Sequence, residues 1–253
     1  MPPSTNDSTS AAPERSAASR DAWRGRLLRG SLLVNTVFAV VALGVGARRL
    51  WNARKPSSGD VYAEERRSLH DALPARPGAI VFLGDSLTDR GAWSEIFGDA
   101  RIANRGIAGD TTTGILARTP QIAAQRPAKV LLCAGVNDLG AGDPNDAIAA
   151  RYGAILDTFR KASPETALVC ESVLPVRPPL APAGMTNDRI RALNEALRRV
   201  AADRACTFVD LWPALADADG ALPATFTLDG VHLTGAGYVA WARAIEPFVR
   251  TAR

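Results

Sequence analysis

The chain has 253 residues, of which 47% are hydrophobic and 22% charged, as in globular proteins large enough to bury a substantial core. Its net charge of +4 is concentrated at one end: residues 1–55 hold nine arginines and lysines against three acidic residues, whereas the rest hold 21 against 23. We therefore expect no nucleic-acid partner, because the globular part lacks the excess of basic residues that such binding requires.

The N-terminal end of the chain predicts a membrane anchor. Residues 1–29 are basic and rich in Ser, Ala, Thr and Pro, and we expect them to form a disordered tail. Residues 30–47 contain no charged side chain; as a helix they would span about 27 Å, which just crosses a hydrocarbon core. Arginines on both sides and a tryptophan beyond each end favour a single transmembrane signal-anchor helix.

Two alternatives stay open for this segment. A cleaved signal peptide has the same basic and apolar regions, but Arg48 and Arg49 would directly follow its cut, which is unfavourable. A buried core helix is the second, although the segment lies outside the strand–helix repeat described next. We expect the anchor to hold the following domain outside the cytoplasm, in the periplasm if the organism is bacterial. The flanking charges nearly balance, so the orientation and the cleavage both stay open.

Strand-like and helix-like stretches alternate in the rest of the chain. Residues 48–77 come first as a polar stalk, within which residues 61–73 have the pattern of a short amphipathic helix. In the domain that follows, residues 78–253, the apolar and β-branched stretches are 79–83, 101–104, 129–134, 167–173 and 206–210. Helical periodicity covers 112–125, 146–161, 187–204 and a stretch beginning at 234. This alternation indicates an α/β domain with a five-stranded parallel sheet covered by helices on both faces.

Three of the predicted strands run directly into polar, glycine-containing segments, at 84–86, 104–106 and 135–138. The carboxyl ends of parallel strands meet at one edge of a sheet, and α/β proteins bind ligands beyond that edge. We therefore expect the three segments to lie together.

Ser86 follows the first strand and is a candidate nucleophile. A nucleophilic serine needs a base, usually histidine, and the chain has only two. His70 lies in the stalk, whereas His232 lies in a glycine-rich loop before the last helix, three residues after Asp229. In a turn, Asp229 would accept a hydrogen bond from the imidazole and fix its tautomer, although the same residues also fit an ordinary turn before the helix cap Thr234.

Acyl transfer also needs donors for the oxyanion. Gly106 offers a backbone N–H and Asn137 a side-chain amide, although each residue alone also suits an ordinary turn. Three strand ends that together carry the residue types of one reaction favour the functional interpretation. Residues 84–88 lack the second glycine of a GxSxG motif, which excludes the elbow of the α/β-hydrolases.

The three cysteines, at positions 133, 170 and 206, lie in apolar stretches and show no CxxC or Cys/His ligand spacing. We interpret them as buried free thiols. This spacing argues against a structural zinc site, and we expect no cofactor.

Four short segments together resemble the conserved blocks of the SGNH (GDSL-type) hydrolases: Gly84-Asp85-Ser86-Leu87, Gly106, Gly135-Val136-Asn137-Asp138 and Asp229-Gly230-Val231-His232. Residues 104–112 and 229–238 are most similar to the platelet-activating-factor acetylhydrolase catalytic-subunit branch. The resemblance covers residues 79–250 and implies a flavodoxin-like, three-layer α/β/α fold without a metal. It implies Ser86 as the nucleophile, His232 as the base and Asp229 as its partner. It also implies an oxyanion hole formed by the N–H groups of Ser86 and Gly106 with the Asn137 amide.

We therefore predict a membrane-tethered serine esterase that hydrolyses short-acyl esters, with acetyl as the first choice, through a Ser-His-Asp triad and an acyl-enzyme. Its small-molecule substrate would be an O-acetyl sugar or a lipid ester. Residues 173–184 are a candidate specificity loop, in which Arg177 is a candidate contact to an anionic substrate group. Two alternatives stay open: an O-acyltransferase that uses the same triad on a carbohydrate acceptor, and a non-catalytic, membrane-anchored binding module. The sequence makes no prediction of the oligomeric state.

Overall fold

The computed structural model describes residues 35–36, 38–46 and 57–250, and the chain divides into two units, Met1–Pro56 and Ser57–Arg253. Residues 35–36 and 38–46 are helical. The rest of the predicted anchor and the predicted tail lie outside the described residues. Over the described ranges, none of the helices combines the length and the apolar character that crossing a membrane requires.

The second unit is built on the predicted five-stranded parallel sheet, with the strand order β2-β1-β3-β4-β5. The strands are β1 (Ile80–Gly84), β2 (Ile102–Gly106), β3 (Lys129–Cys133), β4 (Ala167–Glu171) and β5 (Thr207–Val209). The first four are almost wholly buried, because helices cover both faces, and this explains their continuous apolar sequences. The last residues of β1, β2 and β3 pair in register, so the segments after them begin at one level.

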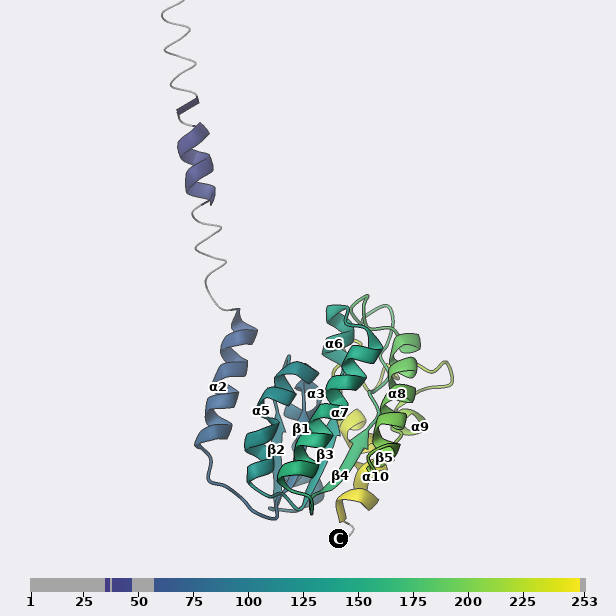
Figure 1. The fold of residues 1–253 in the computed structure, drawn as a ribbon. Coiled ribbons are helices and arrows are strands. Elements are labelled where there is room, and N and C mark those ends of the chain that lie inside the picture. Colours follow the sequence, from purple (N-terminus) through teal and green to yellow (C-terminus); the bar gives the residue numbers. More distant parts are fainter. Residues whose placement is uncertain (1–34, 37, 47–56, 251–253) are drawn as a thin grey trace, which may run out of the picture. The chain divides into compact units, whose positions relative to one another are not determined.

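Helices cover both faces of this sheet (Figure 1). Three long helices pack in sequence on one face: α5 (Thr112–Ala124), α7 (Asn145–Ala162) and α8 (Asn187–Ala202). The opposite face carries α4 (Trp93–Phe97) and α10 (Gly235–Arg250). The predicted three-layer α/β/α fold is confirmed.

Aromatic rings fasten the second helical layer to the sheet. The Trp93 ring stacks on Phe82 of β1 with 4.7 Å between centroids and meets the Trp241 ring edge-on at 4.8 Å. Both tryptophans are almost fully buried, and aromatic pairs of this kind stabilise a core beyond the area they bury. The remaining short helices are α3 (Ser86–Asp89), α6 (Val136–Ala141) and α9 (Trp212–Leu215).

The segment predicted as a stalk contains the 15-residue helix α2 (Ser58–Ala72), which belongs to the same unit as the sheet. The Tyr62 hydroxyl donates to the Asp89 carboxylate at 2.5 Å, and Arg66 pairs with the same carboxylate at 3.1 Å. Because α2 is bonded to the domain in this way, the folded unit begins with this helix rather than at residue 78.

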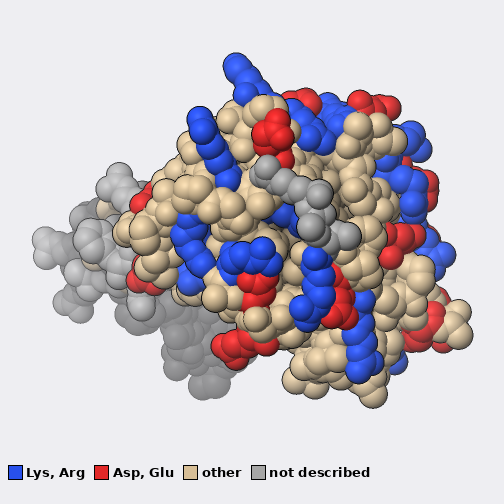
Figure 2. Space-filling view, turned by 90° about the horizontal axis from the view of Figure 1, so that it is seen from below, with Lys and Arg blue, Asp and Glu red and all other residues tan. Residues whose placement is uncertain are grey.

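Charges are mixed on the surface of the domain. Figure 2 views the end at which the chain terminates in Figure 1, and Lys and Arg are interspersed there with Asp and Glu. Neighbouring charges pair, as Arg101 does with Asp99 and Arg250 with Glu246, each at 2.7 Å. This face therefore lacks the uniform positive potential that attracts nucleic acid.

All three cysteines are free thiols, as predicted. Cys133 and Cys170 are buried in central strands, whereas Cys206 is only partly buried because it precedes the edge strand β5.

Candidate active site

Ser86 lies at the start of α3, directly after β1. Asp85 caps this helix through a hydrogen bond from the backbone at 2.9 Å, and burial raises the pKa of Asp85 to about 7. Gly84 allows α3 and β3 to lie close to the end of β1, since a Cβ there would lie 2.2 Å from Thr88 Oγ1 and 2.4 Å from the Cys133 carbonyl oxygen. Ser86 thus lies at the carboxyl edge of the sheet, where 5% of its surface is exposed.

The loop before α10 holds His232 against Asp229; we call residues 229–232 the histidine loop. Asp229 Oδ1 accepts from the Val231 N–H at 3.0 Å and from the His232 N–H at 2.8 Å, a local turn that aspartate favours. Gly230 between them has a φ of +88°, which glycine adopts without strain. The other carboxylate oxygen, Oδ2, is left 2.6 Å from His232 Nδ1.

The structure brings Ser86, His232 and Asp229 into one chain of hydrogen bonds, with Ser86 Oγ 3.0 Å from His232 Nε2. Burial acts to raise the pKa of Asp229. The hydrogen bonds from the His232 ring and from the N–H groups of Val231 and His232 outweigh it and lower the pKa to about 2. Asp229 is therefore ionised at neutral pH and favours a proton on Nδ1, which leaves Nε2 to accept the serine proton.

Gly106, a predicted oxyanion donor, is the last residue of β2 and packs against α3, the helix that begins with Ser86. Its N–H donates to Asn104 Oδ1 at 2.8 Å, and a Cβ at Gly106 would lie 2.2 Å from the Asp89 backbone nitrogen. Asn104 Nδ2 in turn donates to three carbonyl oxygens at the end of α3, at 2.9–3.1 Å. The Gly106 N–H, predicted to bind the oxyanion, is therefore already bonded to Asn104. Asn104 and Gly106 together hold α3 in place.

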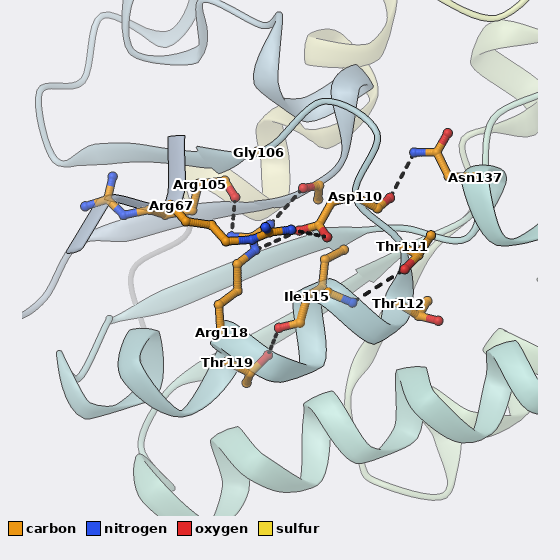
Figure 3. Close-up of polar contacts among 12 residues, drawn as sticks. Arg67, Arg105, Gly106, Asp110, Thr111, Thr112, Ile115, Arg118, Thr119 and Asn137 are labelled. Atoms are coloured by element: carbon orange, nitrogen blue, oxygen red, sulfur yellow. Dashed lines mark hydrogen bonds and ion pairs between the residues drawn. The ribbon is translucent and has the colours of Figure 1, made fainter. Parts of the chain in front are cut away.

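Asn137, the other predicted donor, lies in the first turn of α6. Its Nδ2 donates to the Asp110 carbonyl oxygen at 2.9 Å (Figure 3), which uses one of its two amide N–H groups and leaves the second for a ligand. The adjacent Asp138 is fully buried; it accepts from the Thr112 N–H at 3.0 Å and pairs with Arg151 at 3.0 Å. These bonds tie α6 to the start of α5 and so fix the position of Asn137.

Arg118 of α5, with a side chain that is 10% exposed, ties the ends of β1 and β2 together. It donates to the carbonyl oxygens of Gly84 at 3.0 Å and Arg105 at 2.7 Å, and it pairs with the Asp110 carboxylate at 2.8 Å (Figure 3). Because the Asp110 carbonyl oxygen receives the Asn137 amide, Arg118 helps to position both the nucleophile turn and the oxyanion side of the site.

Residues 173–184, the predicted specificity loop, pack against the histidine loop. The Arg177 N–H donates to the Gly230 carbonyl oxygen at 2.8 Å, and a Cβ at Gly230 would lie 2.8 Å from Leu180 Cβ. The Arg177 guanidinium lies 3.6 Å from the Asp217 carboxylate. Its charge is therefore balanced within the protein, which argues against the predicted contact to an anionic substrate.

Sequence reasoning missed three residues that position the site: Asn104, Asp138 and Arg118. The first two lie inside the strand-end segments and inside the motifs of the family resemblance, but neither was assigned a role. Arg118 carried no signal, because an arginine in the middle of an amphipathic helix is ordinarily exposed. His70 lies on α2 and takes no part in this site.

A serine, a histidine and a carboxylate in hydrogen-bond contact, at the carboxyl edge of a parallel sheet, are the arrangement of serine hydrolases. The model of the GDSL-like Lipase/Acylhydrolase family matches residues 82–240. The chain belongs to this family, and it is a carboxylic ester hydrolase.

Similar proteins include relatives and solved structures. The platelet-activating factor acetylhydrolase IB subunit alpha1 of Bos taurus is 28% identical over 77% of this chain and 87% of its own length. A GDSL-like lipase from Bacteroides thetaiotaomicron has a TM-score of 0.63 and 24% identity, covering 73% of this chain and 96% of that one. A variant of an acetyl-xylooligosaccharide esterase from Geobacillus has a TM-score of 0.57 and 19% identity, covering 71% and 98%. The two solved structures share the fold.

Proposed function

We propose that this protein is a serine esterase that hydrolyses short-acyl esters, acetyl esters above all, through an acyl-enzyme on Ser86. The observation that carries the proposal is the hydrogen-bonded chain from Ser86 through His232 to Asp229. The similarity to an acetylhydrolase subunit supports acetyl as the acyl group.

The geometry supports a two-step reaction. Ser86 Oγ bonds to the ester carbonyl carbon while its proton passes to His232 Nε2, and the same proton then goes to the departing alcohol. Water next attacks the acyl carbon and gives a proton to His232, which returns it to Ser86 Oγ as the acid leaves. Asp229 stays ionised throughout and stabilises the imidazolium.

For the oxyanion we infer three donors: the N–H of Ser86, the Asn137 amide and the N–H of Gly109 rather than that of Gly106. The Gly106 N–H already has a side-chain acceptor, whereas the Gly109 N–H has none within residues 57–250. Gly109 directly precedes Asp110, whose carbonyl oxygen receives the Asn137 amide. Gly109 has a φ of +80°, and the space around its Cβ position is open, which favours a position where a substrate can reach its N–H.

Two exposed leucines border the site and support a substrate with an apolar part. Leu228 is 86% exposed and directly precedes Asp229. Leu180 is 55% exposed and lies against Gly230 of the histidine loop. Single exposed leucines are ordinary, but two beside one loop favour a lipid ester among the candidate substrates.

A substrate panel on the full-length protein tests this function. It compares p-nitrophenyl acetate, butyrate and octanoate, an O-acetylated xylo-oligosaccharide and a 2-acetyl phospholipid, each with wild type and Ser86→Ala. We expect kcat/KM to be highest for acetyl and to fall with chain length. A preference for octanoate would refute the acetyl specificity alone. Acyl transfer to an added sugar would favour the acyltransferase, and turnover on no ester would favour the binding module.

For the N-terminal segment we propose the predicted anchor, with the catalytic unit outside the cytoplasm. The charge-free stretch 30–47 and its basic flanks support it. A C-terminal alkaline phosphatase fusion should be active and a C-terminal GFP fusion dark, with the protein resistant to carbonate extraction. The opposite fusion result would show that the catalytic unit lies in the cytoplasm. Release by carbonate would contradict the proposed anchor.

A further inference from the structure

A cavity of about 390 Å³ lies between α2 and α5, beside the edge strand β2, and none of its lining residues is Ser86, Asp229 or His232. Its charged lining consists of Arg67 and Asp71 from α2, Arg105 from β2 and Arg118 from α5. Asp110 pairs with Arg118, and Glu64 and Asp110 lie near Arg67, so the charge of Arg105 is the one that no carboxylate balances.

Arg105 is the least balanced of these charges. It is 5% exposed, its guanidinium donates to the neighbouring Asn104 carbonyl oxygen at 3.1 Å, and it takes part in none of the ion pairs among residues 57–250. The nearby Asp110 carboxylate is bound by Arg118 at 2.8 Å and lies 3.8 Å from Arg67 (Figure 3). A buried guanidinium without a carboxylate partner is costly, so an anion in the cavity would stabilise it.

His70 provides a second, independent indication at the same place. It lines the cavity, it is 8% exposed, and both of its ring nitrogens are buried without a hydrogen-bond partner in the protein. Buried polar atoms nearly always have a partner. Burial, reinforced by the charges of Arg105, Arg66 and Arg118, lowers the pKa of His70 to about 3. The imidazole is therefore neutral and lies in a positive potential.

We propose that this cavity binds a phosphate group, either as free phosphate or as the head group of a phosphomonoester. Its donors come from two sides, Arg67 and His70 on α2 and Arg105 on β2. Arg118 on α5 adds positive charge to the lining, although its guanidinium nitrogens already donate within the protein. A tetrahedral phosphate presents oxygens in all these directions, whereas a planar carboxylate presents both oxygens along one edge. The volume also leaves room for an ester substituent beside Gln121.

The two histidines allow a direct test, because the chain contains no others. Full-length protein with isotope-labelled histidine is titrated with inorganic phosphate at constant ionic strength. The His70 ring resonances should shift saturably, and those of His232 should not. Arg105→Gln should weaken the apparent affinity roughly tenfold or more, because a charge-assisted bond is lost. Arg243→Gln, an exposed arginine on α10, is the matched control and should bind as wild type does.

A second arm identifies the source of the phosphate. Vesicles of phosphatidylcholine with and without phosphatidic acid are compared with soluble glycerol 3-phosphate. The basic N-terminal segment contributes equally to vesicle binding in every variant, so the part lost in Arg105→Gln measures the cavity. Loss from phosphatidic acid vesicles assigns a lipid head group. A His70 shift with the soluble phosphates alone assigns a soluble ligand.

Two further variants keep the proposal testable if Arg105→Gln does not fold. Arg67→Gln removes a charge from a less buried position, and Ala117→Phe narrows the cavity while every charge remains. Both should abolish or strongly reduce the His70 shift. The proposal is overturned if neither phosphate nor phosphatidic acid vesicles shift His70, if the folded variants respond as wild type does, or if His232 alone responds.

Discussion

Ser86 Oγ lies 3.0 Å from His232 Nε2, although 146 residues separate the two along the chain. A second contact between the same two regions of the chain supports it. The Tyr238 hydroxyl of α10 donates to the Leu87 carbonyl oxygen at 2.8 Å, which ties the helix after the histidine loop to the helix that begins with Ser86. The serine and its base are therefore positioned by packing between α3 and α10.

Ser86→Ala should reduce turnover of p-nitrophenyl acetate by roughly 10³-fold or more, because the nucleophile is lost while the fold is kept. The measurement is kcat, calculated from the concentration of folded protein. Ser68→Ala, at an exposed position on α2, is the control and should retain full turnover. Comparable activity in both variants would refute the proposed nucleophile.

Asp229→Asn should lower kcat by roughly 10²–10⁴-fold with a much smaller change in KM, because the asparagine no longer stabilises the imidazolium. Since the pKa of Asp229 is about 2, the carboxylate is ionised at every assay pH from 5 to 9 and should contribute no limb to the wild-type pH–rate profile. Asp219→Asn, an exposed position, is the charge-matched control. A variant at Asp229 with wild-type kcat would remove it from the mechanism.

Asn137→Ala should reduce kcat by roughly 10²–10³-fold and leave KM nearly unchanged, because the amide is needed chiefly by the oxyanion of the transition state. A tetrahedral organophosphorus adduct on Ser86 tests whether Gly106 or Gly109 donates to the oxyanion. On its formation, the Gly109 amide proton should shift strongly downfield, whereas the Gly106 amide proton, bonded to Asn104, should not. A shift at Gly106 instead would restore the original assignment.

Glu171 should make the protein less stable as the pH rises. It is 1% exposed and accepts from Trp241 Nε1 at 2.7 Å, and burial raises its pKa from 4.5 to about 8. Between these values the folded state holds a proton that the unfolded state releases, so the free energy of unfolding falls with rising pH.

Glu171→Gln keeps the acceptor for Trp241 and removes this titration. In urea unfolding at pH 5 and pH 8, the variant should lose less stability between the two than wild type does. Glu165→Gln, at an exposed position, should keep the wild-type dependence. Equal slopes for wild type and the Glu171 variant would contradict a buried, protonated Glu171.

The strands and long helices were predictable because burial imposes regular patterns on the sequence. Strands covered on both faces are continuously apolar, and the helices over them show a period of 3.6 residues. The predicted ranges differ from the observed ones by one or two residues at most ends. The stalk was the exception: a polar helix such as α2 gives no sign in sequence that Tyr62 and Arg66 will bind Asp89.

The sequence by itself determined the fold class, the family resemblance and the histidine loop, because each depends on residues that are neighbours in the chain or follow a regular period. Asp229 and His232 meet through a local turn. Only the tertiary structure decided which N–H groups are already bonded, as at Gly106. It also decided which buried side chains of residues 57–250 lack a hydrogen-bond partner, as His70 does, or an ion-pair partner, as Arg105 does. Those properties depend on contacts between segments far apart in sequence, and no local pattern encodes them.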